Sequence, residues 1–117
     1  MKIAQIIQLL DATVYHLPTS SEHEIRSVAA CDLMSDVLAN PSKDKILLTG
    51  LTNSQTIRTA ALLDLCGVVI VRGKEPQPEA VELAKKMDMP LLGAKWSLFA
   101  ACAKLHEAGL RGMDEKD

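Results

Sequence analysis

The chain has 117 residues, of which 48% are hydrophobic and only 3% aromatic. This length suffices for one domain with a single aliphatic core and is too short for two. The formal net charge is −2 and like charges do not cluster, which argues against nucleic acid or an acidic membrane surface as the main partner. No stretch approaches the ~18 apolar residues of a membrane span, so we expect a cytoplasmic protein with no membrane partner.

The cysteines and histidines form no recognisable chemical motif. The three cysteines are odd in number, widely spaced and surrounded by apolar residues, which predicts buried free thiols in a reducing compartment. The three histidines lack partners at metal or triad spacing, so we expect surface or packing roles and no metal site. The residues concerned are Cys31, Cys66, Cys102, His16, His23 and His106.

The N-terminal elements are predicted from the spacing of apolar residues. These recur at i, i+3, i+4 and i+7 between Ile3 and Leu10, which is typical of a short amphipathic helix. A strand is expected over residues 12–16 and a second over residues 25–30. A polar turn at residues 17–22 separates them.

A helix is predicted after the second strand. Asp32 suits its N-cap, because the carboxylate can accept hydrogen bonds from the free amides of the first turn. The proline-containing segment 40–44 ends this helix, since the residue before a proline disfavours the α conformation. The apolar run at residues 45–49 then predicts a strand.

The centre of the chain repeats this pattern. Asn53 or Ser54 caps the next predicted helix, which Cys66 and Gly67 turn back. Residues 68–71 form a β-branched run without alternation, as expected of a strand covered on both faces. Pro78 then fits the first turn of another helix.

The C-terminal third supplies one more unit. Residues 91–92 predict a short strand, residues 93–95 a loop, and the apolar spacing beyond them a last helix that ends at Gly109. We expect a single domain over residues 1–112 and a charged, frayed tail over residues 113–117.

These alternating elements predict an α/β fold, namely a three-layer sandwich with a mainly parallel sheet built from repeated β-α units. Ligands of such sheets bind beyond the carboxyl ends of the strands. The loops that follow three strands carry cations, glycines, and hydroxyl or amide donors, and helix N-termini favour anions. The candidate ligand-binding residues are Thr49, Gly50, Thr52, Asn53, Arg72, Gly73, Lys74 and Lys95. The alternative is that these are solvated loops whose glycines only turn the chain.

The sequence gives no support to an enzyme. A kinase would need a Gly-x-x-x-x-Gly-Lys-Ser/Thr loop to wrap the terminal phosphates, and the chain has none. Asp32 and Asp36 are four residues apart, but helix capping and solvation account for them. Cys66 and Cys102 have no adjacent base to activate them. We therefore expect no catalytic residues and no cofactor.

Five segments carry a resemblance to a known family: residues 32–38, 48–50, 57–61, 70–79 and 89–92. Over residues 3–110 the chain resembles the DRTGG domain, a small α/β module found beside the acetyl transfer domain of some phosphate acetyltransferases, next to CBS domains, and alone in anaerobes. The implied fold is similar to the N-terminal domains of HPr kinase and of Mur ligases. The family's Asp-Arg pair is replaced here by Asn53 and Ser54, and its Thr-Gly-Gly by Val71, Arg72 and Gly73.

The resemblance implies a regulatory or interaction module, often dimeric. One hypothesis is a ligand-sensing domain that binds an anionic, nucleotide-like small molecule and controls a partner enzyme of fermentative or redox metabolism. The other is a ligand-free protein-protein interaction or homodimerisation module. Its interface would use exposed apolar residues, for which the candidates are Leu51, Met87, Met89 and Trp96.

Overall fold

The computed structural model describes residues 1–19, 23–32, 34–39 and 44–115. These residues include a six-stranded sheet with the spatial order β1-β5-β4-β3-β2-β6. Neighbouring strands run parallel except for β1, which pairs antiparallel with β5. The strands are β1 (Thr13–His16), β2 (Ser27–Ala30), β3 (Lys45–Thr49), β4 (Gly67–Ile70), β5 (Leu91–Gly93) and β6 (Arg111–Gly112).

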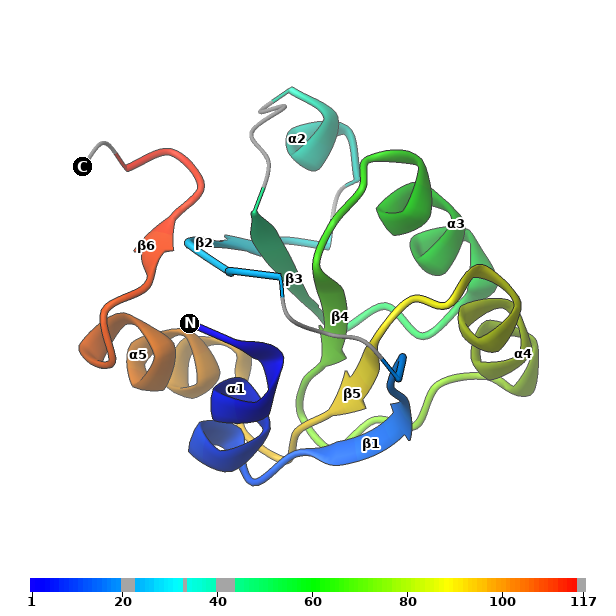
Figure 1. The fold of residues 1–117 in the computed structure, drawn as a ribbon, viewed down its shortest axis with the longest axis horizontal. Coiled ribbons are helices and arrows are strands. Elements are labelled where there is room, and N and C mark those ends of the chain that lie inside the picture. The colour runs from blue at the N-terminus through cyan, green and yellow to red at the C-terminus, as the bar shows by residue number, and fades with distance from the viewer. Residues whose placement is uncertain (20–22, 33, 40–43, 116–117) are drawn as a thin grey trace.

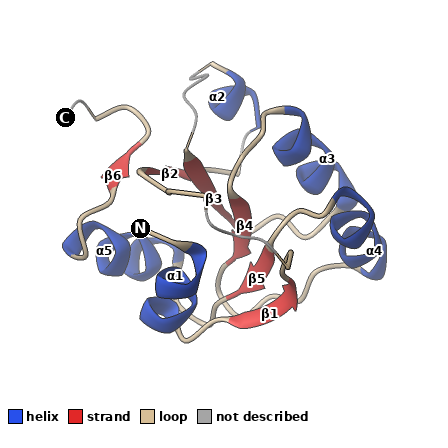
Figure 2. Cartoon of the chain, in the orientation of Figure 1, coloured by secondary structure: helices blue, strands red, loops and turns tan. Residues whose placement is uncertain are grey.

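Helices cover both faces of this sheet (Figures 1 and 2). Two helices pack on one face and three on the other, and a separate apolar core fills each side. The first pair is α1 (Ile3–Leu10) and α5 (Leu98–Glu107), and the second group is α2 (Met34–Leu38), α3 (Ser54–Leu62) and α4 (Pro78–Met87). The predicted three-layer α/β sandwich with a mainly parallel sheet is therefore confirmed.

The sequence pattern explains the helices and central strands. Ile3, Ile6 and Leu10 of α1 are buried, because their spacing places them on the face turned to the sheet. Asp11 and Asp88 end α1 and α4 in the left-handed conformation, which aspartate tolerates better than most residues. Strands β3 and β4 are buried at every position, as expected of strands with helices on both faces.

Two glycines have a role different from the predicted one. Gly67 does not end a helix: α3 stops at Leu62, and Gly67 is the first residue of β4. Gly93 is the last residue of β5 and not part of the following loop. A side chain at Gly93 would collide with a tyrosine, since its Cβ would lie 2.8 Å from Cε2 of Tyr15. Gly93 therefore allows β1 and β5 to approach each other.

Other details of the sequence reading also change. Residues 111–112, for which no element was predicted, form the short strand β6 beside β2. Met89 is only 6% exposed and belongs to the core, so the expectation that it contributes to an exposed interface is wrong. The predicted turns at residues 17–22 and 40–44 lie partly outside the described residues. No helix in the described ranges is long and apolar enough to cross a membrane.

Candidate functional site

The carboxyl ends of three parallel strands lie at the same edge of the sheet. Thr49 of β3 pairs in register with Ile70 of β4, and Ile70 pairs with Gly93 of β5. The loops that follow these strands therefore start side by side. This arrangement was predicted from the alternation of strands and helices. We call this region the carboxyl edge.

Asp32, which follows β2, is the central acidic group of the carboxyl edge. Its Oδ1 accepts hydrogen bonds of 2.8 Å from the Thr49 hydroxyl and of 2.8 Å from the Gly50 amide. The Gly50 hydrogen bond, the Thr49 hydrogen bond and the nearby charges of Arg72 and Lys74 lower the pKa of this carboxyl. Asp32 is therefore ionised at neutral pH. The cap predicted for Asp32 adjoins residue 33, which lies outside the described residues, and in the described part the carboxylate holds the turn after β3.

Two cations approach the same turn from the loop after β4. The space beside the Gly50 Cα, where other residues have a Cβ, faces both Arg72 and Asp32. Arg72 Nη2 and the two Asp32 carboxylate oxygens each lie 3.7 Å from that Cβ position. Lys74 Nζ donates to the Gly50 carbonyl at 3.5 Å. Asp32, Arg72 and Lys74 thus surround the Gly50 turn. Their formal charges sum to one net positive charge.

The backbone conformation of Arg72 is uncommon for its residue type. Five described non-glycine residues have positive φ, and four of these are aspartates. Arg72 is the fifth, with φ of 63°, and Gly73 follows with φ of 67°. A left-handed conformation costs a residue with a Cβ about 1–2 kcal/mol relative to glycine. The fold therefore keeps a long cationic side chain at a position where glycine would be favoured.

Several backbone donors of the carboxyl edge are already used. The amides of Arg72, Gly73 and Lys74 donate to the carbonyls of Trp96, Ala94 and Val71, respectively. Side chains cap two of the helices that start at this edge: Asn53 accepts from the Thr56 amide in α3, and Ser97 from the Ala100 amide in α5. The third, α4, starts with a proline, which has no amide hydrogen. The side chains of Arg72 and Lys74 add positive charge for an anion beside the Gly50 turn.

The remaining predicted site residues lie around this group or outside it. The Thr52 carbonyl accepts from the Gln77 amide and ties the loop after β3 to the start of α4. The side-chain oxygen of Asn53 also accepts from the Thr56 hydroxyl. The Nζ of Lys95, the third predicted cation, lies 4.9 Å from the centre of the Trp96 ring. The structure thus brings Thr49, Gly50, Arg72 and Lys74 together around Asp32, and Lys95 contacts Trp96.

The thiols of this protein are poor nucleophiles. All three cysteines are free and partly exposed rather than fully buried. Burial raises the pKa of each thiol, and that of Cys66 reaches about 11, with the nearby Asp44 charge contributing. Within the described residues, no group of three His, Cys, Asp or Glu side chains is placed to hold a metal ion. The charged groups around the Gly50 turn that could contact a ligand are therefore the Asp32 carboxylate and the side chains of Arg72 and Lys74.

The fold and this site together define a small α/β domain with a charged group at the carboxyl ends of its strands. The sequence matches no protein-family profile and no curated protein. Among solved structures, the chain is similar to the CBS and DRTGG domains of the regulatory region of Clostridium perfringens pyrophosphatase, crystallised with its activator diadenosine tetraphosphate. The TM-score is 0.76 at 17% identity, over 88% of this chain and 45% of that one. This chain thus corresponds to less than half of that structure, and the likeness establishes the fold.

Proposed function

We propose that this protein is a DRTGG-like regulatory domain that binds an anionic, nucleotide-like ligand at the carboxyl edge. The observation that carries the proposal is Arg72, an arginine held in a left-handed conformation beside Lys74 and the Gly50 turn. Backbone strain at a charged surface residue is often retained for function. The similar pyrophosphatase region was crystallised with a nucleotide activator, which supports the same class of ligand.

The phosphate groups of the ligand would bind Arg72 and Lys74. Arginine binds phosphate oxygens through two parallel hydrogen bonds, and lysine acts as a point charge. Both side chains are exposed, so they can reorient toward a ligand. The Asp32 carboxylate holds the Gly50 turn and offers an acceptor for ligand hydroxyl groups. Thr49 is fully buried and acts only by positioning Asp32.

A binding role fits the chemistry of the carboxyl edge better than catalysis does. The Asp32 carboxylate has a lowered pKa, whereas a general acid or base works best with a pKa near the operating pH. The cysteines are protonated at neutral pH, because burial raises their pKa. We propose that the domain acts by controlling a partner enzyme of fermentative or redox metabolism and that it forms a homodimer.

Thermal unfolding in the presence of ATP, diadenosine tetraphosphate or adenosine tests the ligand proposal. A ligand at 100 times its Kd adds about 2.7 kcal/mol of stability. With an unfolding entropy of ~2.1 cal/mol/K per residue, a 117-residue chain should gain roughly 11 °C in Tm. The phosphorylated compounds should raise Tm, and adenosine should not. If neither ATP nor diadenosine tetraphosphate raises Tm, the sensing proposal fails.

Variants then locate the site. Arg72→Gly removes the guanidinium and relieves the left-handed backbone, so unliganded Tm should hold or rise while the nucleotide-induced shift falls. Lys74→Ala should weaken binding further. The matched control is Lys85→Ala with Lys86→Ala, which removes two positive charges from the last turn of α4, about 11 Å along that helix from Pro78. Equal loss of binding in the control would mean nonspecific charge attraction and would overturn the assignment.

A further inference from the structure

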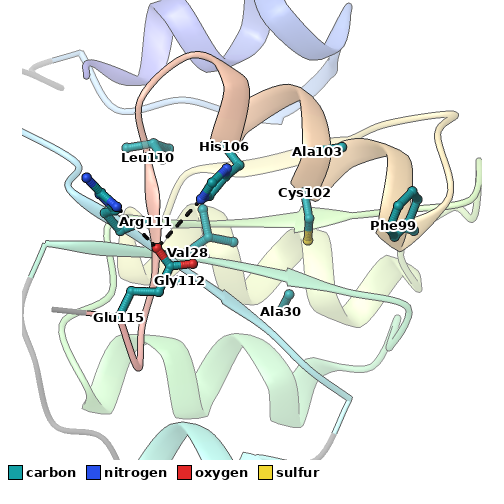
Figure 3. Close-up of a pocket in the computed structure, with 10 residues that line it drawn as sticks. All are labelled: Val28, Ala30, Phe99, Cys102, Ala103, His106, Leu110, Arg111, Gly112 and Glu115. Carbon is teal, nitrogen blue, oxygen red and sulfur yellow. Dashed lines mark ion pairs between the residues drawn. The ribbon is translucent and has the colours of Figure 1, made fainter.

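A cavity lies away from the carboxyl-edge cations, between α5 and the sheet. Its volume is about 300 Å³. Val28 and Ala30 of β2 line it on the sheet side, and Cys102 and Ala103 of α5 on the helix side. Figure 3 shows this group, with Phe99 at one end of the row and the charged residues at the other. We call it the α5 cavity.

One stripe of α5 forms the helical wall of the α5 cavity. Phe99, Cys102, Ala103 and His106 are spaced i, i+3, i+4 and i+7 and therefore share a helix face. The stripe spans roughly 10 Å along the helix axis at 1.5 Å per residue. Phe99 is 84% exposed, although large aromatic side chains are usually covered. The cavity therefore has an apolar wall whose most apolar end is open to solvent.

A carboxylate already occupies the opposite end of the α5 cavity. Glu115 Oε2 lies 3.6 Å from His106 Nε2 and 3.7 Å from Arg111 Nη1, as the dashed lines in Figure 3 mark. All three side chains are substantially exposed, at 60% for His106, 53% for Arg111 and 40% for Glu115. Exposed ion pairs at such distances contribute ~0–1 kcal/mol. Glu115 can therefore be displaced at little cost.

We propose that the α5 cavity binds a small monocarboxylate with an apolar body. The ligand carboxylate takes the place of Glu115 beside Arg111 and His106, and its body runs along the α5 stripe toward Phe99. The size sets the class of ligand: at the ~30 Å³ that a water molecule takes up in the liquid, 300 Å³ holds about ten non-hydrogen atoms. A medium-chain fatty carboxylate has this size. The proposal does not involve Arg72 or Lys74 and stands independently of nucleotide binding.

The arrangement of the cavity supports this ligand over a neutral or cationic one. Small-molecule sites are mostly apolar, with a few polar groups that fix orientation. Here both fixing groups beside the apolar wall, Arg111 and His106, are donors that a carboxylate satisfies. A cationic head group could approach Glu115 only beside Arg111, which already pairs with that carboxylate and would repel the cation. An uncharged head group would leave the Arg111–Glu115 pair in place across one end of the cavity.

Titration of the full chain with sodium octanoate tests the proposal, with binding followed by calorimetry and by amide NMR shifts. Octanoate should bind saturably at one site and shift the amides of Val28, Cys102 and Leu110. Octan-1-ol has the same body without the charge, and its affinity should be lower by a factor of about five or more. Arg111→Gln should weaken octanoate by a similar factor. Glu115→Gln should tighten it by about two- to fivefold, or about 0.4–1.0 kcal/mol at 1.4 kcal/mol per tenfold, because the internal competitor is gone.

Control variants separate this site from nonspecific association. Ala103→Leu fills the middle of the α5 cavity and should abolish saturable binding, whereas Glu107→Gln removes an acidic charge from the same helix outside the cavity and should change nothing. Circular dichroism checks that Ala103→Leu folds, and if it does not, the exposed Arg111→Gln decides the question. Nonsaturable octanoate binding, equal affinity for octan-1-ol, or an unchanged affinity in Arg111→Gln would each overturn the proposal.

Discussion

Substitution of Asp32 is the sharpest test of how the carboxyl edge is held together. Asp32→Ala removes the acceptor of two hydrogen bonds, one from the Gly50 amide and one from the Thr49 hydroxyl. Thr49 is 0% exposed, so water cannot readily replace its lost acceptor, and its oxygen still accepts from the Leu51 amide. A buried donor left without a partner costs ~1–3 kcal/mol. Because Asp32 itself is exposed, we expect Asp32→Ala to destabilise the fold by about 1–2 kcal/mol.

Asp32→Asn separates the charge of this residue from its geometry. The amide oxygen of asparagine can still accept both hydrogen bonds, so the loss should be about 0.5 kcal/mol, close to that of a surface charge interaction. Urea unfolding of wild type, Asp32→Ala and Asp32→Asn at pH 7 measures both losses in the free energy of unfolding, provided that the three proteins have equal m-values. If Asp32→Ala costs no more than Asp32→Asn, the hydrogen bonds to Thr49 and Gly50 do not stabilise the edge.

The pH dependence of this difference has a defined sign. The folded-state pKa of Asp32 is lowered from its ordinary value of 3.8, so the ionised form stabilises the folded chain above pH 3.8. This contribution is lost as the pH falls below 3.8 and through the folded-state pKa, because the carboxyl then becomes protonated. The stability gap between wild type and Asp32→Asn should thus be constant near neutral pH and shrink below pH 3.8. A gap that persists unchanged at lower pH would refute the electrostatic reasoning.

Three other substitutions or measurements test separate parts of the fold. Gly93→Ala should destabilise the domain by about 1–3 kcal/mol in urea, because its Cβ would meet Tyr15, and this cost should shrink in a Tyr15→Ala background. Asn53→Ala removes the cap of α3 and should cost ~1 kcal/mol, whereas Asn53→Asp should not. With a pKa raised from 9.0 to about 11, Cys66 has roughly ninetyfold less thiolate at pH 8 than an ordinary cysteine, so maleimide should label it correspondingly slowly in a variant without the other two thiols. Labelling at the rate of a free cysteine would contradict its burial.

The carboxyl edge could be anticipated because it depends only on strand direction. Parallel strands joined by helices place their carboxyl ends together whatever their detailed register, and this brought Arg72 and Lys74 to the turn at Gly50. The direction of β1 could not be read in the same way. A four-residue strand pairs either parallel or antiparallel, and the pattern at Thr13–His16 does not distinguish them.

The role of Asp32 was missed because it depends on the register between two strands. Ala30 pairs with Leu48, so two residues further along each strand Asp32 lies opposite Gly50. Helix capping is a local rule and was applied first, whereas the contact with Gly50 spans 18 residues of sequence. An acidic residue two positions beyond one parallel strand, together with a Thr-Gly pair at the end of its neighbour, is the signal that would have found it. The two-residue strand β6 is too short to give any periodic signal.

Strand β2 connects the two proposed sites. Val28 and Ala30 line the α5 cavity. Asp32 lies about 7 Å beyond Ala30 at ~3.3 Å per residue, at the Gly50 turn where Arg72 and Lys74 are proposed to bind a nucleotide. A carboxylate ligand that moves β2 must therefore also move the acceptor that holds the Gly50 turn. Linkage requires the effect to be reciprocal, and a coupling of ~1 kcal/mol changes each affinity about fivefold. Nucleotide titrations with and without saturating octanoate should show this factor, and the reverse titration should give the same one. Identical nucleotide affinities in both conditions would mean that β2 is rigid and the two sites are independent.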